Sequence, residues 1–162
     1  PDTGASTSFS AGFTAPWGIL FDGNNLWVAD QGDNMLKKLD SNGAVIQNVQ
    51  VGAKPAFPVF DGANIWVPNS GDDSLTVVRA RDGVVLATLT GNGLGGPLQA
   101  AFDGQRVLVT SLTGNSISLW KATDLTPIAT FMTGGFSGPL GACSDGINFW
   151  ITLGQAGRLA RL

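Results

Sequence analysis

The side chains of this 162-residue chain that could do chemistry are almost all oxygen and amide groups. There is no histidine and no glutamate, so all twelve acidic residues are aspartates. A Ser-His-Asp or Cys-His arrangement is therefore impossible within the chain, because each needs a histidine as its base. The residues present suit hydrogen bonding to a sugar or a peptide, or coordination of Ca²⁺, which takes about six to eight oxygen ligands. We predict no catalytic residue.

Three polar residues, Asp30, Asn69 and Ser111, recur at one position of successive sequence units. In one hypothesis they form a polar ring that binds a sugar, a peptide or a cation such as calcium. In the other they cap strand ends and satisfy turn amides, as Asx and Ser residues commonly do. The residue types favour the second interpretation.

Further candidates lie in the neighbouring loops. Trp17 is a candidate stacking platform, because Ala, Leu and Leu stand at its position in the other units, although core packing is the stronger expectation. The full set of candidate ligand-binding residues is Trp17, Asp30, Asn34, Asn69, Asp73, Ser111 and Asn115.

Cys143 is the single cysteine, which excludes an internal disulfide. It aligns with Leu20, Val59 and Ala101, so a small apolar role explains it. The sequence places neither a cation nor a helix N-terminus beside it, and a reactive thiol normally needs one of them.

The charge pattern excludes several classes of partner. Nine basic residues against twelve acidic ones give a net charge of −3, and the basic residues are scattered from Lys37 to Arg161. Nucleic acid is not an expected partner, because phosphate binding needs clustered positive charge. No apolar run approaches the roughly 20 residues that span a bilayer, so membrane insertion is not expected. Low charge and abundant glycine, serine and threonine favour an extracellular or cell-surface location.

Asp-Gly pairs mark an internal repeat. They occur at residues 22–23, 61–62, 103–104 and 145–146, at intervals of 39, 42 and 42 residues. A proline stands six residues before each of these aspartates, at Pro16, Pro55, Pro97 and Pro139. A strongly apolar run follows each pair. Fixed spacing of about 40 residues indicates a repeat architecture.

Each repeat is predicted to form four short strands. The first runs from the proline to the Asp-Gly turn, where glycine supplies a positive φ. The apolar run is the second strand, and two more follow. A four-stranded antiparallel unit of about 40 residues has the size of a β-propeller blade. The aligned large residues expected to fill the space between adjacent blades are Trp27, Trp66, Leu108 and Trp150.

The predicted fold class is therefore all-β: a single β-propeller domain, or half of one, over residues 1–162, with four blade repeats. The repeats cover approximately residues 13–52, 53–91, 92–134, and 135–162 plus 5–12. The last repeat stops within its third strand, and residues 7–12 resemble the outer-strand sequences 87–91 and 129–134. The N-terminal segment is expected to be the outer strand of the last blade, which would close a ring.

Three arrangements of this ring stay open. Closure within one chain gives four blades. If the N-terminal strand completes the last blade of another chain, two chains form an eight-bladed homodimeric ring. In the third arrangement the chain is a piece of a longer propeller. Bulky residues between blades suit all three, so packing does not decide.

The stretch from Pro16 to Asn34 resembles the blade consensus of the NHL, YVTN and virginiamycin B lyase-like propeller superfamily, and the resemblance extends to all four repeats. It implies a propeller fold, and members of the group include surface-layer proteins, protein-binding modules and a few enzymes. The streptogramin lyase of this group relies on a histidine with a metal ion. The gluconolactonase-like branch uses metal ligands that include glutamate. Neither residue type is present in this chain.

We therefore expect a non-catalytic binding or assembly module that contacts a protein or a glycan at the mouth of the central channel. The alternative is a metal-assisted hydrolase or lyase that uses Asp, Asn and Ser at that channel. No cofactor is expected apart from calcium in the polar-ring hypothesis.

Overall fold

The computed structural model of the chain describes residues 4, 6–135 and 137–162. Every regular element in this part of the chain is a β-strand, which confirms the all-β prediction. No helix long and apolar enough to cross a membrane is found in it. Ala5 and Phe136 belong to the predicted last repeat and lie outside the described residues.

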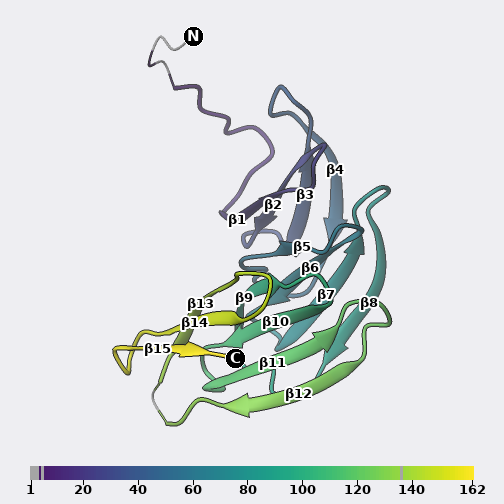
Figure 1. Cartoon of the computed structure of the whole chain (residues 1–162). Coiled ribbons are helices and arrows are strands. Elements are labelled where there is room, and N and C mark those ends of the chain that lie inside the picture. The colour runs from purple at the N-terminus through teal and green to yellow at the C-terminus, as the bar shows by residue number, and fades with distance from the viewer. Residues whose placement is uncertain (1–3, 5, 136) are drawn as a thin grey trace.

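The strands form four antiparallel sheets, one for each repeat (Figure 1). The first sheet contains β1 (Pro16–Phe21), β2 (Leu26–Asp30), β3 (Met35–Leu39) and β4 (Val45–Gln50). The second contains β5 (Val59–Phe60), β6 (Asn64–Asn69), β7 (Ser74–Arg79) and β8 (Val84–Thr90). The third contains β9 (Pro97–Phe102), β10 (Arg106–Ser111), β11 (Ser116–Lys121) and β12 (Pro127–Met132). The fourth contains β13 (Pro139–Ser144), β14 (Phe149–Leu153) and β15 (Arg158–Arg161).

Strands pair in chain order, so each sheet is a meander. β5 is short because Phe57, two residues before it, pairs with the third sheet and not with β6. Pro55 bridges to Asn69 within its own sheet, and Phe57 forms a parallel bridge with Gln99 of the next sheet. The innermost parts of the second and third sheets are therefore joined by backbone hydrogen bonds.

The Asp-Gly turns have the structural role predicted for them. Gly23 and its three equivalents have φ values between 89° and 101°, a backbone conformation that residues other than glycine rarely adopt. Asp22 Oδ1 accepts hydrogen bonds from the backbone amides of Asn24 and Asn25 at 2.8 and 2.7 Å. The equivalent aspartates accept the corresponding two amides in every repeat.

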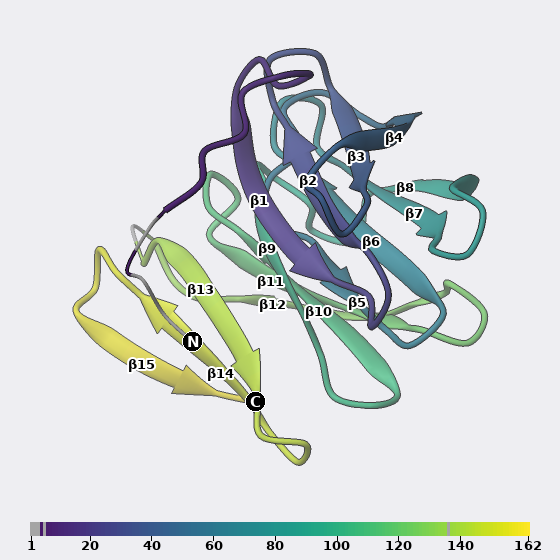
Figure 2. The ribbon, with the colours of Figure 1, turned by 90° about the horizontal axis from the view of Figure 1, so that it is seen from above.

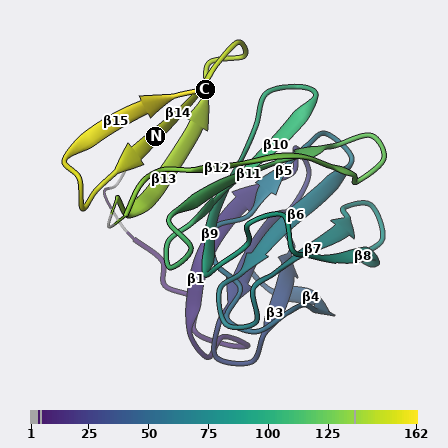
Figure 3. The ribbon, with the colours of Figure 1, turned by 90° about the horizontal axis from the view of Figure 1, so that it is seen from below.

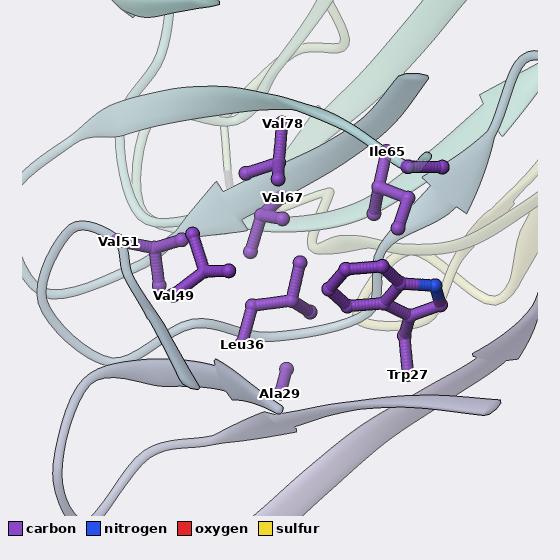
Figure 4. Close-up of a cluster of buried hydrophobic side chains, with 9 residues drawn as sticks. Trp27, Ala29, Leu36, Val49, Val51, Ile65, Val67 and Val78 are labelled. Carbon is purple, nitrogen blue, oxygen red and sulfur yellow. The ribbon is translucent and has the colours of Figure 1, made fainter. Parts of the chain in front are cut away.

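The apolar core lies between successive sheets. Figure 4 shows Trp27 and Leu36 of the first sheet packed against Ile65 and Val67 of the second. Two further clusters join the second sheet to the third and the third to the fourth. The aligned large residues of the first three sheets are fully buried, as predicted. Trp150, their counterpart in the fourth sheet, is only half-buried because no further sheet covers it.

The four sheets are propeller blades that follow one another around an arc (Figure 2). β13 contacts β9 and β10 of the third blade, and Figure 3 shows the fourth blade beside it. No core cluster among the described residues joins the fourth blade to the first. The arc therefore has two open ends, one at each terminal blade.

The described residues do not supply the predicted outer strand of the last blade. Of this segment, residues 6–12 are described, and they form no strand there. Figure 1 shows the purple segment that leads into β1 apart from β15. The fourth sheet consequently ends at β15, with three strands in the described part of the chain.

Candidate binding surfaces

Asn34, Asp73 and Asn115 occupy one turn position and tie successive blades together. Each has a left-handed backbone, with φ of 60°, 54° and 48°. Asn34 Oδ1 accepts a hydrogen bond from the Lys54 amide at 2.9 Å, and Asp73 Oδ1 accepts one from the Gly96 amide at 2.7 Å. Asn115 does the same with the loop that enters the fourth blade. The predicted candidates are thus engaged between blades, where each holds the loop entering the next blade.

Asp30 belongs to a buried charge cluster. It accepts hydrogen bonds from the amides of Thr14 and Ala15 at 2.8 and 2.7 Å and from Lys37 Nζ at 2.9 Å. Burial acts to raise the pKa of Asp30, but the bonds from Lys37 and from backbone amides outweigh it and lower the pKa to about 2. Burial acts to lower the pKa of Lys37, and its hydrogen bonds to Asp33 and Asp30 outweigh that effect and raise it.

The predicted polar ring is not open to a ligand in this structure, because Asp30, Asn69 and Ser111 are all fully buried. Asn69 Nδ2 donates to Ser74 Oγ at 3.0 Å and Thr76 Oγ1 at 2.9 Å. Asn69 Oδ1 and Ser111 Oγ are buried atoms without a hydrogen-bond partner in the described structure. All three residues lie at strand ends, but only Asp30 accepts hydrogen bonds from loop amides, as the capping interpretation expects.

Trp17 is 56% exposed, which corrects the expectation that it packs in the core. Its ring lies 6.1 Å from that of Phe57, tilted by 46°. Ile19 and Phe21 follow on β1 and are 64% and 60% exposed. With Leu26 they line an apolar groove of about 810 Å³ over the first blade. We call Ile19, Phe21 and Leu26 the back face of the first blade. In the other blades, the equivalent positions are covered by the preceding blade.

The other end of the arc carries the front face of the fourth blade, which we define as Trp150, Thr152 and Leu159. Leu159 is 62% exposed and Thr152 is exposed. The Arg161 guanidinium lies over the Trp150 ring, 5.8 Å from its centroid. Both ends of the arc therefore present apolar side chains beside a few polar groups.

Sequence reasoning missed these two faces as candidate surfaces. Ile19 and Phe21 lie within the first predicted strand of their repeat, and Leu159 lies within the third predicted strand of the last repeat. The signal was available in the alignment of the repeats. Positions that are core in the middle repeats lack a covering blade on one side in the first and last repeats.

Cys143 lies on β13, and its thiol is free and exposed, so it does not take the apolar packing role expected from its alignment with Leu20, Val59 and Ala101. Across the described residues, no group of three or more Asp or Cys side chains is arranged to hold a metal ion. Calcium binding stays a prediction.

No protein-family model and no curated protein sequence matches the chain. Solved structures match it over nearly its whole length. Virginiamycin B lyase from Staphylococcus aureus superposes with a TM-score of 0.77 at 17% identity, over 91% of this chain and 52% of that one. A chain of Kuenenia stuttgartiensis hydrazine synthase gives 0.80 at 20% identity, over 96% and 48%. The computationally designed Ika8 protein gives 0.77 at 15% identity, over 91% and 45%.

The chain thus spans about half the length of the structures it matches. At these identities the likeness concerns the fold. Together with the four blades, it confirms that this chain has the fold of the virginiamycin B lyase-like β-propellers.

Proposed function

We propose that the chain is a non-catalytic binding and assembly module whose partner is a protein. The observation that carries the proposal is the exposed apolar back face of the first blade, where Ile19 and Phe21 are each at least 60% exposed. Contiguous apolar surface of this kind marks interaction sites in stable proteins.

The predicted polar ligand-binding residues also favour a protein partner, because most of them are already engaged in contacts within the chain. Asn34, Asp73 and Asn115 accept hydrogen bonds from the next blade, and Asp30 is buried on Lys37. Few of the predicted ligand-binding groups are left to recognise a sugar. A protein partner needs mainly apolar area with a polar rim, and Asn24, Asp40 and Ser41 supply such a rim around the groove.

The metal-assisted hydrolase or lyase is the alternative, and it needs a carboxylate cluster at the channel. Stoichiometric calcium in the purified protein, together with hydrolysis of a test substrate, would favour it over the binding module.

Site-specific photo-crosslinking tests the proposal. A benzoylphenylalanine probe replaces Trp17 at the edge of the groove, and the control probe replaces Ile128, which is 49% exposed on the outer strand β12. Irradiation in an extract of the native source is expected to give protein adducts from position 17 and at least about tenfold fewer from position 128. Equal yields from both positions would overturn the proposal. Glycan-array binding that is lost in Trp17→Ser, without protein adducts, would replace the protein partner by a glycan.

A further inference from the structure

Every blade interface in the chain joins the front of one blade to the back of the next. At the first interface, Trp27 and Leu36 come from the front of one blade, and Ile65 and Val67 come from the back of its neighbour. The next two interfaces repeat this arrangement at equivalent positions. One rule therefore holds at every blade interface in the chain: the front of a blade is covered by the back of the next blade.

The two open ends of the arc are the two halves of such an interface. Leu26 is the first-blade equivalent of Ile65, and it is 38% exposed where Ile65 is fully buried. Leu159 is the last-blade equivalent of Leu36, and it is 62% exposed where Leu36 is fully buried. The first blade exposes its back face and the fourth blade exposes its front face. These are the two kinds of face that pack together at every blade interface within the chain.

A polar contact follows the same rule. Lys38 lies 5.0 Å over the Trp27 ring and donates a hydrogen bond to the Ala80 carbonyl of the next blade at 3.2 Å. Arg161 stands at the position of Lys38 and lies over the tryptophan of its own blade in the same way. Ser41 stands at the position of Ala80, so its carbonyl is the equivalent acceptor on the open back of the first blade.

The last blade also lacks its outer strand. In the three complete blades, one apolar residue of the third strand faces an apolar residue of the fourth. These pairs are Leu36 with Val49, Leu75 with Leu89, and Ile117 with Phe131. Leu159 takes this place on β15, and no strand of the described chain pairs with that edge. An unpaired edge of this kind accepts an added strand.

Phe9 has the right position in the sequence to face Leu159. It lies seven residues before Pro16, while Val49 and Phe131 lie six and eight residues before the prolines of their next blades. The Gly12 carbonyl accepts a hydrogen bond from Lys37 at 2.6 Å, which anchors the end of the segment to the first blade. Residues 6–11 make no backbone hydrogen bond to a strand in the described structure. The segment is thus held at Gly12, and the Phe9 ring lies against Gly43 of the first blade, while the backbone of residues 6–11 pairs with no described strand.

We infer that a second copy of this chain covers both open ends. The back face of one copy packs on the front face of its partner, and residues 6–11 add to the partner's β15, with Phe9 opposite the partner's Leu159. Two arcs of four blades then close into one ring of eight, within the range of about four to eight blades typical of propellers. This inference rests on the proposed function, whose protein partner it names.

Disulfide trapping between two copies tests the inference. One tagged chain carries Phe9→Cys and another, with a different tag, carries Leu159→Cys, both with Cys143→Ala. Facing residues of antiparallel strands lie within the roughly 4.4–6.8 Å between Cα atoms that a disulfide needs. After mixing, unfolding and refolding together, oxidation is expected to link the two chains. Ile128→Cys in place of Leu159→Cys is the control, with at least about tenfold less linked product.

The back face is tested in the same assay. Ile19→Asp in both chains places an unpaired charge in the interface and is expected to lower the linked product at least about tenfold. Ile128→Asp is the matched change on an exposed strand and should leave the yield unchanged. If circular dichroism shows that Ile19→Asp does not fold, Arg161→Asp tests the opposite face.

Two results would overturn the inference. One is the absence of linked product from the mixed chains. The other is an internal disulfide in a dilute single chain that carries both cysteines, which would show a four-bladed ring. If no linked product forms while the probe at position 17 captures a different protein, the inference fails and the proposed function stands. If neither experiment gives an adduct, both fail.

Discussion

The indole Nε1 of Trp27 donates a hydrogen bond of 2.7 Å to Oδ2 of Asp22, five residues before it. The same bond occurs in the second and fourth blades, at 2.7 and 2.8 Å. In the third blade Arg106 takes the place of the indole on Asp103. One carboxylate thus fixes a turn with its first oxygen and orients the side chain that fills the space between blades with its second.

Removal of this carboxylate should destabilise the fold. Asp61→Ala leaves the Trp66 indole and two turn amides without their acceptor, in the second blade where Trp66 is fully buried. We expect a loss of about 2–3 kcal/mol in the free energy of unfolding, measured by urea denaturation. Asp124→Ala, at an exposed turn, is the control and should have a far smaller effect. Equal losses would contradict the role assigned to Asp61.

Two substitutions at Asn34 separate the stability contributed by its hydrogen bond to the next blade from the cost of its left-handed backbone. Asn34→Gly keeps the left-handed φ of 60° but removes the hydrogen bond to Lys54, at an expected cost of about 1 kcal/mol. Asn34→Ala removes the same bond and adds the strain of a left-handed alanine, which costs roughly 1 kcal/mol more. Thermal unfolding should therefore rank wild type above Gly and Gly above Ala. An alanine variant as stable as the glycine variant would show that backbone strain is not significant there.

Gly18 is predicted to tolerate no side chain. A Cβ at this position would lie 2.0 Å from the Ala56 carbonyl oxygen, which belongs to the next blade. Gly18→Ala should force the first two blades apart and cost about 2–3 kcal/mol. Gly135→Ala, where a Cβ meets nothing within 4 Å, is the control and should change the urea midpoint little. Unfolding of both variants at the same urea concentration would show that Gly18 does not pack closely against Ala56.

Stability should fall in acid, in part through Asp30. Its folded-state pKa of about 2 lies below the ordinary value of 3.8. The carboxylate therefore contributes fully above about pH 4, and the contribution of roughly 2 kcal/mol is lost as the pH falls towards 2. Asp22, Asp103 and Asp145 also have lowered pKa values and share this dependence.

Asp30→Asn isolates the contribution of this residue. The variant should be less stable at pH 6, because Lys37 loses one of its buried charged partners. Its urea midpoint should change less than that of wild type between about pH 4 and 2. Parallel curves for the two proteins would contradict the assignment.

The sequence was sufficient for features that depend on local chemistry. The Asp-Gly turns need only a glycine with positive φ and a short carboxylate, so their spacing was enough to predict the four blades. The role of Asn34 in holding the loop that enters the second blade was not predictable, because its partner is the amide of Lys54, twenty residues away. The burial of Asp30 likewise depends on Lys37 and on the loop at Thr14.

Whether the arc closes into a ring, and with how many blades, could not be predicted from the sequence. That number depends on what covers Ile19 and Leu159, and repeat length does not report it. In the structure both residues are more than 60% exposed, so an arc of four blades leaves both of its end faces uncovered.

The mass of the particle in solution distinguishes a ring of two arcs from a single arc of four blades. Light scattering on a size-exclusion column, run over a range of concentrations, compares the particle with the chain mass of 16.7 kDa. A ring made of two arcs predicts a particle of twice that mass, which dissociates in Ile19→Asp and persists in Ile128→Asp. A particle with the mass of one chain at every concentration would contradict a ring of two arcs.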